Sequence, residues 1–275
     1  MQKALAEPFE TQLTIKSQAW SLRRNTLRRI SPLLTFAFIL LMWQLVVSLQ
    51  LVDIFLVPAP LDVLSKFGDV LESGLLWRHT QATLYATLAG LFVGGTIGIT
   101  LGYLIARIQI LEDLLSPIIV AFQSTPVVAY APLLVIWFGT GTQSKVVTSA
   151  LIVFFPILMN TIVGIRNVPQ GLHDLMKVSG ASQWQTFIKL EIPASLPVLL
   201  TGLKTGATLA IIGAVVGEFI AARAGLGLLI NIANAQYDTP LVFVVVITLA
   251  IIASSIYAVI SLVESRLLAW QKRSK

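Results

Sequence analysis

Long apolar runs constrain this chain more than any other feature of its sequence. A helix needs about 20 predominantly apolar residues to cross the hydrocarbon core of a bilayer, and runs of that order recur along the whole chain. Only 12% of the residues are charged, against about 25% in soluble domains. This composition excludes a soluble enzyme domain, a disordered chain and a fibrous repeat. The sequence therefore predicts an all-α, polytopic membrane helical bundle.

We expect about six transmembrane helices joined by short polar connections. The first apolar run begins at Pro32 and exceeds the roughly 7–15 apolar residues of a signal peptide, so we interpret it as an uncleaved span. The chain then divides into a basic N-terminal segment (1–31), a transmembrane domain (32–268) and a short tail (269–275). The expected spans are residues 32–52, 81–106, 114–138, 146–165, 194–220 and 241–263.

The basic residues indicate how this bundle is oriented. Cytoplasmic loops of membrane proteins carry an excess of lysine and arginine. With the N-terminus inside, most of the 19 lysines and arginines fall on the cytoplasmic side. The four on the outer side are Lys66, Arg78, Lys145 and Arg223. We therefore expect both termini and the polar segment 167–193 to be cytoplasmic, and we attribute the net charge of +6 to this bias, with no role in nucleic-acid binding.

The second expected span carries a glycine at every fourth position, which places four glycines on one helix face. Small residues let neighbouring backbones approach closely, which matters where lipid supplies no hydrophobic drive between helices. We interpret these residues as a packing face. The alternative is a face that slides or rocks against its neighbours. The glycines are Gly90, Gly94, Gly98 and Gly102.

Residues for catalysis are missing from the sequence. There is no cysteine, no His-Glu-x-x-His motif and no Walker A sequence, so any ATP must be hydrolysed by a separate subunit. No ionisable residue lies in the middle of an expected span, which argues against an ion-coupled carrier with a relay of buried charges. We therefore expect a chain that is not an enzyme and holds no metal.

Segment 167–193 is the longest polar interruption after the N-terminus, and it has the pattern of two short helices. Pro169 suits a helix start, and Gly180 can end that helix in the left-handed conformation. Ser182 and Gln185 have the spacing of a capping box that begins the second helix, and we expect Pro193 to end it. Two interpretations of its apolar face remain: a helix lying among lipid headgroups, or a surface that docks into a partner protein. That face consists of Trp184, Phe187 and Ile188.

This segment resembles the EAA loop of permease subunits in bacterial ATP-binding-cassette importers. The motif reads Glu-Ala-Ala, three residues, Gly, nine residues, Ile-x-Leu-Pro. Asp174 takes the place of the glutamate, and Gly180 and Pro193 stand at the required distances. Leu175 and Met176 replace the two alanines, a departure that affects the packing of the first helix and leaves the spacing intact.

Other segments extend the resemblance over most of the chain, in the order found in the family. Residues 56–64, 125–139 and 217–227 are similar to the branch that transports nitrate, sulfonates and taurine. Residues 237–243 are more similar to its subgroup for thiamine precursors and riboflavin. The chain is thus identified as resembling a permease subunit of a type I, binding-protein-dependent importer.

The resemblance implies a type I importer permease fold in the bacterial inner membrane, with residues 182–190 as a coupling helix. It further implies two copies of the permease, two ATPase subunits that bind ATP and Mg²⁺, and an extracytoplasmic protein that delivers a small solute. No cofactor is expected in this chain itself. The residues expected to couple it to the ATPase are Asp174, Gly180, Ser182, Trp184, Gln185, Phe187, Ile188 and Pro193.

The solute pathway is less clearly marked. We select four polar residues at membrane depth as candidates, the amides because they both donate and accept hydrogen bonds. For the single carboxylate among them, pairing or capping is the alternative to solute contact. The candidates are Gln123, Tyr130, Asn160 and Glu218. Two other functions stay open from the residues alone: an ion-coupled carrier or channel, and an exporter component or scaffold that recruits a cytoplasmic protein.

Overall fold

The computed structural model describes residue 31 and residues 34–270, and these form a helical protein. The expected N-terminal segment, apart from Ser31, and the end of the expected tail lie outside the described residues. The chain forms two units, residues 1–65 and residues 66–275. In the first unit, an apolar helix covers Leu34–Ser48, and the indole nitrogen of Trp43 donates a hydrogen bond of 3.0 Å to the carbonyl oxygen of Pro58. Helix α2 (Pro60–Glu72) crosses the boundary between the units.

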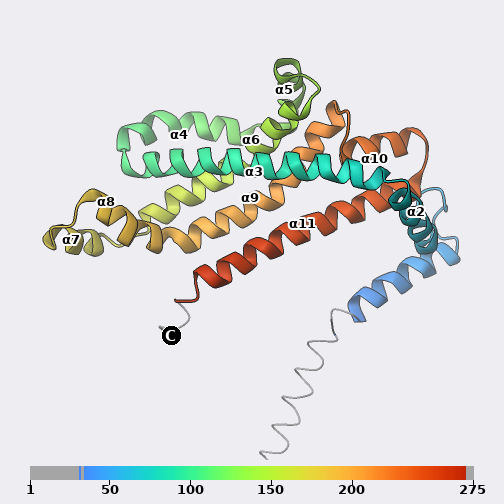
Figure 1. Ribbon diagram of the computed structural model, residues 1–275, viewed down its shortest axis with the longest axis horizontal. Coiled ribbons are helices and arrows are strands. Elements are labelled where there is room, and N and C mark those ends of the chain that lie inside the picture. The colour runs from blue at the N-terminus through green and yellow to red at the C-terminus, as the bar shows by residue number, and fades with distance from the viewer. Residues whose placement is uncertain (1–30, 32–33, 271–275) are drawn as a thin grey trace, which may run out of the picture. The chain divides into compact units, whose positions relative to one another are not determined.

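Three long helices form the centre of the second unit. They are α3 (Leu75–Arg107), α6 (Thr142–Arg166) and α9 (Ile192–Ile220), and they run side by side (Figure 1). Helix α10 (Leu226–Ala235) and helix α11 (Thr239–Leu267) pack against α9. Among the described residues, four helices are long and apolar enough to cross a membrane: α3, α6, the continuous helix ending in α9, and α11.

Glycines bring α3 and α9 against α6 from two sides. On α3, Gly94 leaves no room for a side chain, because a Cβ there would overlap the backbone of Ala150 on α6. On α9, a Cβ on Gly213 would lie 2.6 Å from the Cα of Ser149. The hydroxyl of Ser149 also donates a hydrogen bond of 2.8 Å to the carbonyl oxygen of Ala210 on α9. Gly90, Gly98 and Gly102 likewise face α6. The backbone of α6 therefore packs closely against the backbones of both α3 and α9.

The third expected span is not a single helix. Residues 109–138 instead form α4 (Gln109–Ser124), a 3₁₀ turn (η1, Val127–Ala129) and α5 (Ala131–Phe138). Proline disfavours the helical conformation of the residue before it, and Thr125 is extended, with ψ 128°, as is Pro126, with ψ 123°. Helix α4 alone, with 16 residues and about 24 Å of length, is shorter than the hydrocarbon core.

The expectation that no ionisable residue lies in the middle of a span is wrong for Lys204. This residue lies well inside α9 and forms an ion pair with Glu264 of α11. Its ammonium nitrogen also lies 5.6 Å from the ring centre of Tyr257. A charge in this setting needs a partner, and the pair connects α11 to the central helices. The sequence missed the pair because its two members are 60 residues apart.

Candidate functional site

Segment 167–193 begins with the short helix α7 (Gln170–Val178), which ends in a Schellman motif. Gly180 has φ +71°, the left-handed conformation that glycine adopts without strain. The N–H of Ala181 donates to the carbonyl oxygen of Met176 at 3.0 Å, and that of Gly180 donates to Lys177 at 3.0 Å. Both bonds satisfy carbonyls at the helix end. The turn after α7 is therefore fixed by backbone hydrogen bonds.

Helix α8 (Gln183–Thr186) starts two residues later with the expected capping box. The Ser182 hydroxyl accepts a hydrogen bond of 3.2 Å from the N–H of Gln185. The Gln185 side chain in turn accepts one of 2.9 Å from the N–H of Ser182. A capping box satisfies two N–H groups that a helix start otherwise leaves unpaired. The orientation of α8 relative to α7 is thus defined by local contacts.

Pro193 does not end this helix, contrary to the sequence-based expectation. Helix α8 passes into a π-helical turn (η2, Phe187–Glu191) and then into α9, so that one continuous helix covers Gln183–Ile220. A proline inside an α-helix clashes with the carbonyl four residues earlier. The π turn already departs from that bonding pattern, since the N–H of Ile192 donates to the carbonyl of Phe187, five residues earlier. Pro193 then lies in the first turn of α9, where its missing N–H costs little.

The aromatic residues of α8 and η2 do not share one exposed face. Trp184 is 67% exposed. Phe187 turns inward, with its ring centre 4.9 Å from that of Tyr103 on α3 in an edge-to-face arrangement. The Trp184 ring also lies near that of Phe187, at 5.5 Å between ring centres. Phe187 is thus half-buried and packs within the chain, whereas Trp184 lies at the surface.

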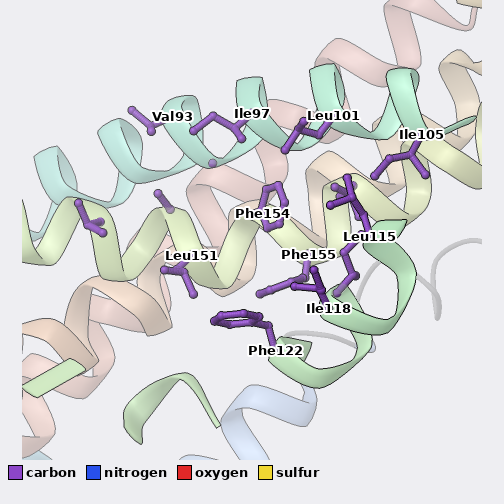
Figure 2. Close-up of a pocket in the computed structure, with 15 residues that line it drawn as sticks. Val93, Ile97, Leu101, Ile105, Leu115, Ile118, Phe122, Leu151, Phe154 and Phe155 are labelled. Atoms are coloured by element: carbon purple, nitrogen blue, oxygen red, sulfur yellow. The ribbon is translucent and has the colours of Figure 1, made fainter. Parts of the chain in front are cut away.

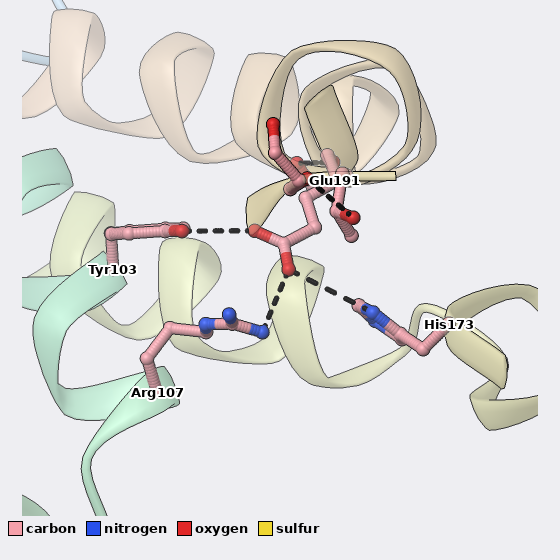
Figure 3. A network of polar contacts seen from close by, with 7 residues as sticks. Tyr103, Arg107, His173 and Glu191 are labelled. Atoms are coloured by element: carbon pink, nitrogen blue, oxygen red, sulfur yellow. Dashed lines mark hydrogen bonds and ion pairs between the residues drawn. The ribbon is translucent and has the colours of Figure 1, made fainter. Parts of the chain in front are cut away.

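The carboxylate of Glu191, the last residue of the π turn, is the centre of a group of polar contacts (Figure 3). Its side chain is 1% exposed. Tyr103 donates a hydrogen bond of 3.0 Å to one carboxylate oxygen, and Arg107 donates one of 2.8 Å to the other. The Nδ1 atom of His173 on α7 lies 3.8 Å from that second oxygen. We call Tyr103, Arg107, His173 and Glu191 the Glu191 cluster. It joins α3, α7 and the start of α9.

The segment exposes five large apolar side chains alongside polar and charged ones. The exposed apolar side chains come from α7, α8 and η2, and Asp174, the counterpart of the motif glutamate, is exposed among them. Large exposed apolar groups that are close together mark binding surfaces for proteins or membranes. These side chains are Leu172, Leu175, Val178, Trp184 and Ile188.

The candidate pathway residues are not gathered in one place. Gln123 is exposed near the end of α4, and Tyr130 is half-buried between η1 and α5, with its ring 6.0 Å from that of Phe122. Asn160 on α6 faces Gly202 of α9, and its amide donates a hydrogen bond of 2.8 Å to the carbonyl oxygen of Pro156 in its own helix. The structure therefore brings none of these three into contact with one another.

A cavity of about 500 Å³ lies among α3, α4 and α6 (Figure 2). Every residue that lines it is apolar, including Leu115, Phe122 and Phe154. A heterocyclic solute there would lose its hydrogen bonds to water without replacement, which is unfavourable. The four candidate pathway residues do not line it. In this conformation the cavity is thus unsuited to a polar solute.

Glu218, the fourth candidate, lies in a second buried group at the other end of α9. Its side chain accepts a hydrogen bond of 2.8 Å from the Thr83 hydroxyl on α3 and one of 2.7 Å from the N–H of Gly227. The Thr83 oxygen also accepts a bond of 2.8 Å from the N–H of Leu226. His79 contacts Gly225, with 2.7 Å between Nδ1 and the carbonyl oxygen. We call Glu218, Thr83, His79 and the turn at residues 225–227 the Glu218 cluster.

The Glu218 cluster explains why two glycines follow Glu218 in the sequence. Gly225 has φ +142°, and a Cβ there would overlap the Glu218 carboxylate. A Cβ on Gly227 would lie 2.9 Å from the Cβ of Glu218. Glu218 is 1% exposed and its carboxylate is hydrogen-bonded within the fold, which agrees with the alternative of a pairing or capping role.

No pattern in the sequence indicated that Tyr103, Arg107, Glu191 and His79 belong to these clusters. The only available signal for Glu191 was an acidic residue in an otherwise apolar and basic stretch, at the unspecified position of the motif. Among the described residues, no group of three or more histidine, aspartate or glutamate side chains is arranged to hold a metal ion.

Comparison with known proteins gives consistent matches over most of the chain. Residues 94–269 match the family described as "Binding-protein-dependent transport system inner membrane component". The riboflavin transport system permease protein RibX of Chloroflexus aurantiacus is 46% identical, over 86% of this chain and 88% of that protein. The formylaminopyrimidine transport permease protein ThiX of Halalkalibacterium halodurans is 34% identical, over 91% of this chain and 99% of that protein. The taurine transport system permease protein TauC of Escherichia coli is 32% identical, over 91% of this chain and 92% of that protein.

A solved structure shares the fold. A chain of the methionine ABC transporter MetNI, in an inward-facing conformation, aligns with a TM-score of 0.64 and 22% identity, over 71% of this chain and 97% of that chain. This similarity confirms the expected type I importer permease fold, and the relatives above lie in the branch that the sequence motifs indicated.

Proposed function

Because the chain belongs to the family of inner membrane components of binding-protein-dependent transport systems, we propose that it conducts a flavin-like heterocycle into the cell. The family membership makes the chain a permease subunit of an ATP-binding-cassette importer. The observation that carries the choice of solute is the 46% identity to a riboflavin permease, well above the 32% to a taurine permease.

The charges of the bundle agree with a neutral solute. An anionic solute such as a sulfonate is bound in proteins by a free basic group, arginine above all. The basic residue deepest in a spanning helix, Lys204, is paired with Glu264. Lys145 on α6 donates to two carbonyl oxygens, those of Thr140 at 3.2 Å and Gly141 at 2.8 Å. Both ammonium groups are therefore occupied by contacts within the chain.

We further propose that segment 167–193 faces the cytoplasm and docks an ATPase subunit. The bias of lysine and arginine supports this orientation. Trp184, at 67% exposed, would enter a groove of the ATPase, while the capping box and the Gly180 turn keep α8 in place. Two copies of this chain would bind two ATPase subunits, which hold ATP and Mg²⁺, and an extracytoplasmic binding protein would deliver the solute at the opposite face.

The docking proposal is tested by replacing the exposed indole. Trp184→Ala should insert into the membrane normally but retain at least tenfold less ATPase subunit on purification, because aromatic anchors dominate such interfaces. Trp77→Ala is the matched control, since Trp77 on α3 is 62% exposed and lies outside the segment. Equal retention of the ATPase by wild type and Trp184→Ala would refute docking through this residue.

The solute proposal is tested in proteoliposomes that contain the purified permease, its ATPase and its binding protein. We expect ATP-dependent uptake of labelled riboflavin and no uptake of labelled taurine. Labelled formylaminopyrimidine is the third solute to compare, because a relative at 34% identity is named for it. Uptake of taurine or formylaminopyrimidine without riboflavin would contradict the proposed solute and leave the permease function standing.

A further inference from the structure

We propose that Glu191 is a positioning residue that joins the coupling segment to α3, so that movement of α8 displaces α3 together with α9. This inference rests on the proposed docking of an ATPase to segment 167–193. Helix α8 is continuous with α9, so a displacement of α8 reaches α9 through the backbone. No covalent path of similar length leads from α8 to α3. Any direct transmission to α3 therefore depends on side-chain contacts.

Those contacts form two matching pairs. Tyr103 and Arg107 are four residues apart on α3 and so lie on one helix face. Phe187 and Glu191 are four residues apart at the start of the long helix. The Tyr103 ring packs on Phe187 at 4.9 Å between ring centres, and its hydroxyl donates a hydrogen bond of 3.0 Å to the carboxylate of Glu191. Arg107 completes the contact with a hydrogen bond of 2.8 Å to the same carboxylate.

The burial of Glu191 makes this contact hard to separate. A carboxylate that is 1% exposed is tolerated only while it is paired and hydrogen-bonded. Moving α8 away from α3 would remove the guanidinium and the phenol together and leave the charge without its two closest donors. Moving α3 along with α8 preserves both. The second course is favoured whenever α8 is displaced.

The position of Glu191 in a π turn directs its side chain toward α3. The turn over Phe187–Glu191 contains one more residue than an α-helical turn. The carbonyl oxygen of Glu191 also accepts a hydrogen bond of 2.6 Å from the Ser195 hydroxyl, which supports the backbone on the α9 side. His173, 3.8 Å from the carboxylate, brings α7 to the same point. One side chain therefore contacts α3 and α7 while belonging to the helix that becomes α9.

Transmission to α3 has a consequence for α6. Helix α6 packs against the glycines of α3 on one side and those of α9 on the other. If only α9 moved, α6 would have to slide along α3 or along α9, although their backbones are closely packed. If α3 and α9 move together, both glycine contacts are kept. The Glu191 cluster thus allows the three central helices to move as one body.

The experiment measures solute molecules imported per ATP hydrolysed in reconstituted proteoliposomes. Glu191→Gln should still bind the ATPase subunits and hydrolyse ATP within about twofold of wild type, because Trp184 and the other exposed residues are unchanged. The number of riboflavin molecules imported per ATP should fall at least fivefold. Glu112→Gln is the matched control, since Glu112 pairs with Arg166 at the same end of the central helices, but its side chain is 25% exposed where that of Glu191 is 1% exposed. The import ratio of Glu112→Gln should stay at the wild-type value.

A second pair of variants removes the dependence on the folding of Glu191→Gln. Arg107 is 38% exposed, so Arg107→Gln should fold, and it should lower the import ratio, whereas Arg107→Lys should restore most of it by keeping the charge. An unchanged ratio in Glu191→Gln, or in Arg107→Gln if the first variant does not assemble, would overturn the proposal. Absence of riboflavin-linked ATP hydrolysis in the wild type would instead overturn the proposed function.

Discussion

Two buried glutamates, one at each end of α9, connect that helix to α3 in different ways. Glu218 is bonded to a neutral hydroxyl and a backbone N–H, and the glycine turn that supplies the N–H has no room for a side chain. Glu191 is bonded to a phenol and a guanidinium, both at the ends of longer side chains. Both carboxylates are 1% exposed, so the difference lies in their partners and not in their burial.

This difference suggests different tasks for the two ends. A contact built from backbone and short side chains has few alternative arrangements, so we assign the Glu218 cluster mainly to stability. A hydrogen-bonded ion pair between side chains of separate elements holds those elements together when one of them is displaced, so we assign the Glu191 cluster mainly to transmission. If this is correct, substitutions in the Glu218 cluster should cost more stability, and those in the Glu191 cluster should cost more transport than stability.

The largest loss of stability is expected for Gly225→Ala. Its φ of +142° strains any residue with a Cβ, and that Cβ would overlap the Glu218 carboxylate. We expect the free energy of unfolding to fall by about 3 kcal/mol or more, measured by SDS titration in mixed micelles. Gly171→Ala is the control, because a Cβ there meets nothing within 4 Å; it should be neutral or slightly stabilising within α7. Equal values for the two variants would refute the role assigned to the glycine turn.

A smaller loss is expected for Thr83→Val. The substitution removes the hydroxyl that donates to Glu218 and accepts from the N–H of Leu226, so two buried groups lose a partner. We expect a loss of about 2 kcal/mol in the same titration. In Thr96→Val, the control on the same helix, the lost hydroxyl bonds only to the carbonyl of Phe92, and we expect almost no change. A loss in Thr96→Val as great as in Thr83→Val would contradict this account of the Glu218 cluster.

The smallest stability effect is expected for Tyr103→Phe in the Glu191 cluster. The ring against Phe187 remains, and Arg107 still pairs with Glu191, so only one hydrogen bond is lost. We expect about 1 kcal/mol, with no loss in the control Tyr85→Phe, whose side chain is 63% exposed. Riboflavin imported per ATP should nevertheless fall measurably in Tyr103→Phe. The distinction between the two clusters would fail if Tyr103→Phe destabilised the protein more than Thr83→Val while importing normally.

Local patterns in the sequence predicted the features that local chemistry decides. Apolar runs of sufficient length predicted the long helices, and the Gly180 turn and Ser182 capping box depend on residues within five positions of one another. Prolines were harder to interpret, because their effect depends on the surroundings. Pro156 and Pro197 lie inside continuous helices, where neighbouring helices stabilise the chain, whereas Pro126 follows an extended Thr125 and separates α4 from α5.

The two buried clusters could not be predicted in the same way. Arg107 and Glu191 are 84 residues apart, and His79 and Gly225 are 146 apart, so no spacing rule connects them. The inward turn of Phe187 likewise follows from its contact with Tyr103 and not from helical periodicity. The motif Gly217-Glu218-Phe219 followed by Gly225-Leu226-Gly227 was visible, but only the structure shows that the glycines accommodate the carboxylate.

The central claim, that the coupling segment and α3 move together, is tested most directly by a distance between them. Because the chain contains no cysteine, spin labels can be attached at Val178→Cys on α7, which is 89% exposed, and Phe92→Cys on α3, which is 74% exposed. The distance is measured by pulsed electron spin resonance in the assembled transporter, with labelled chains diluted among unlabelled ones. We predict one narrow distance, the same with and without bound ATP, which broadens or shifts with ATP in Glu191→Gln. A distance that changes on ATP binding in the wild type would contradict the account.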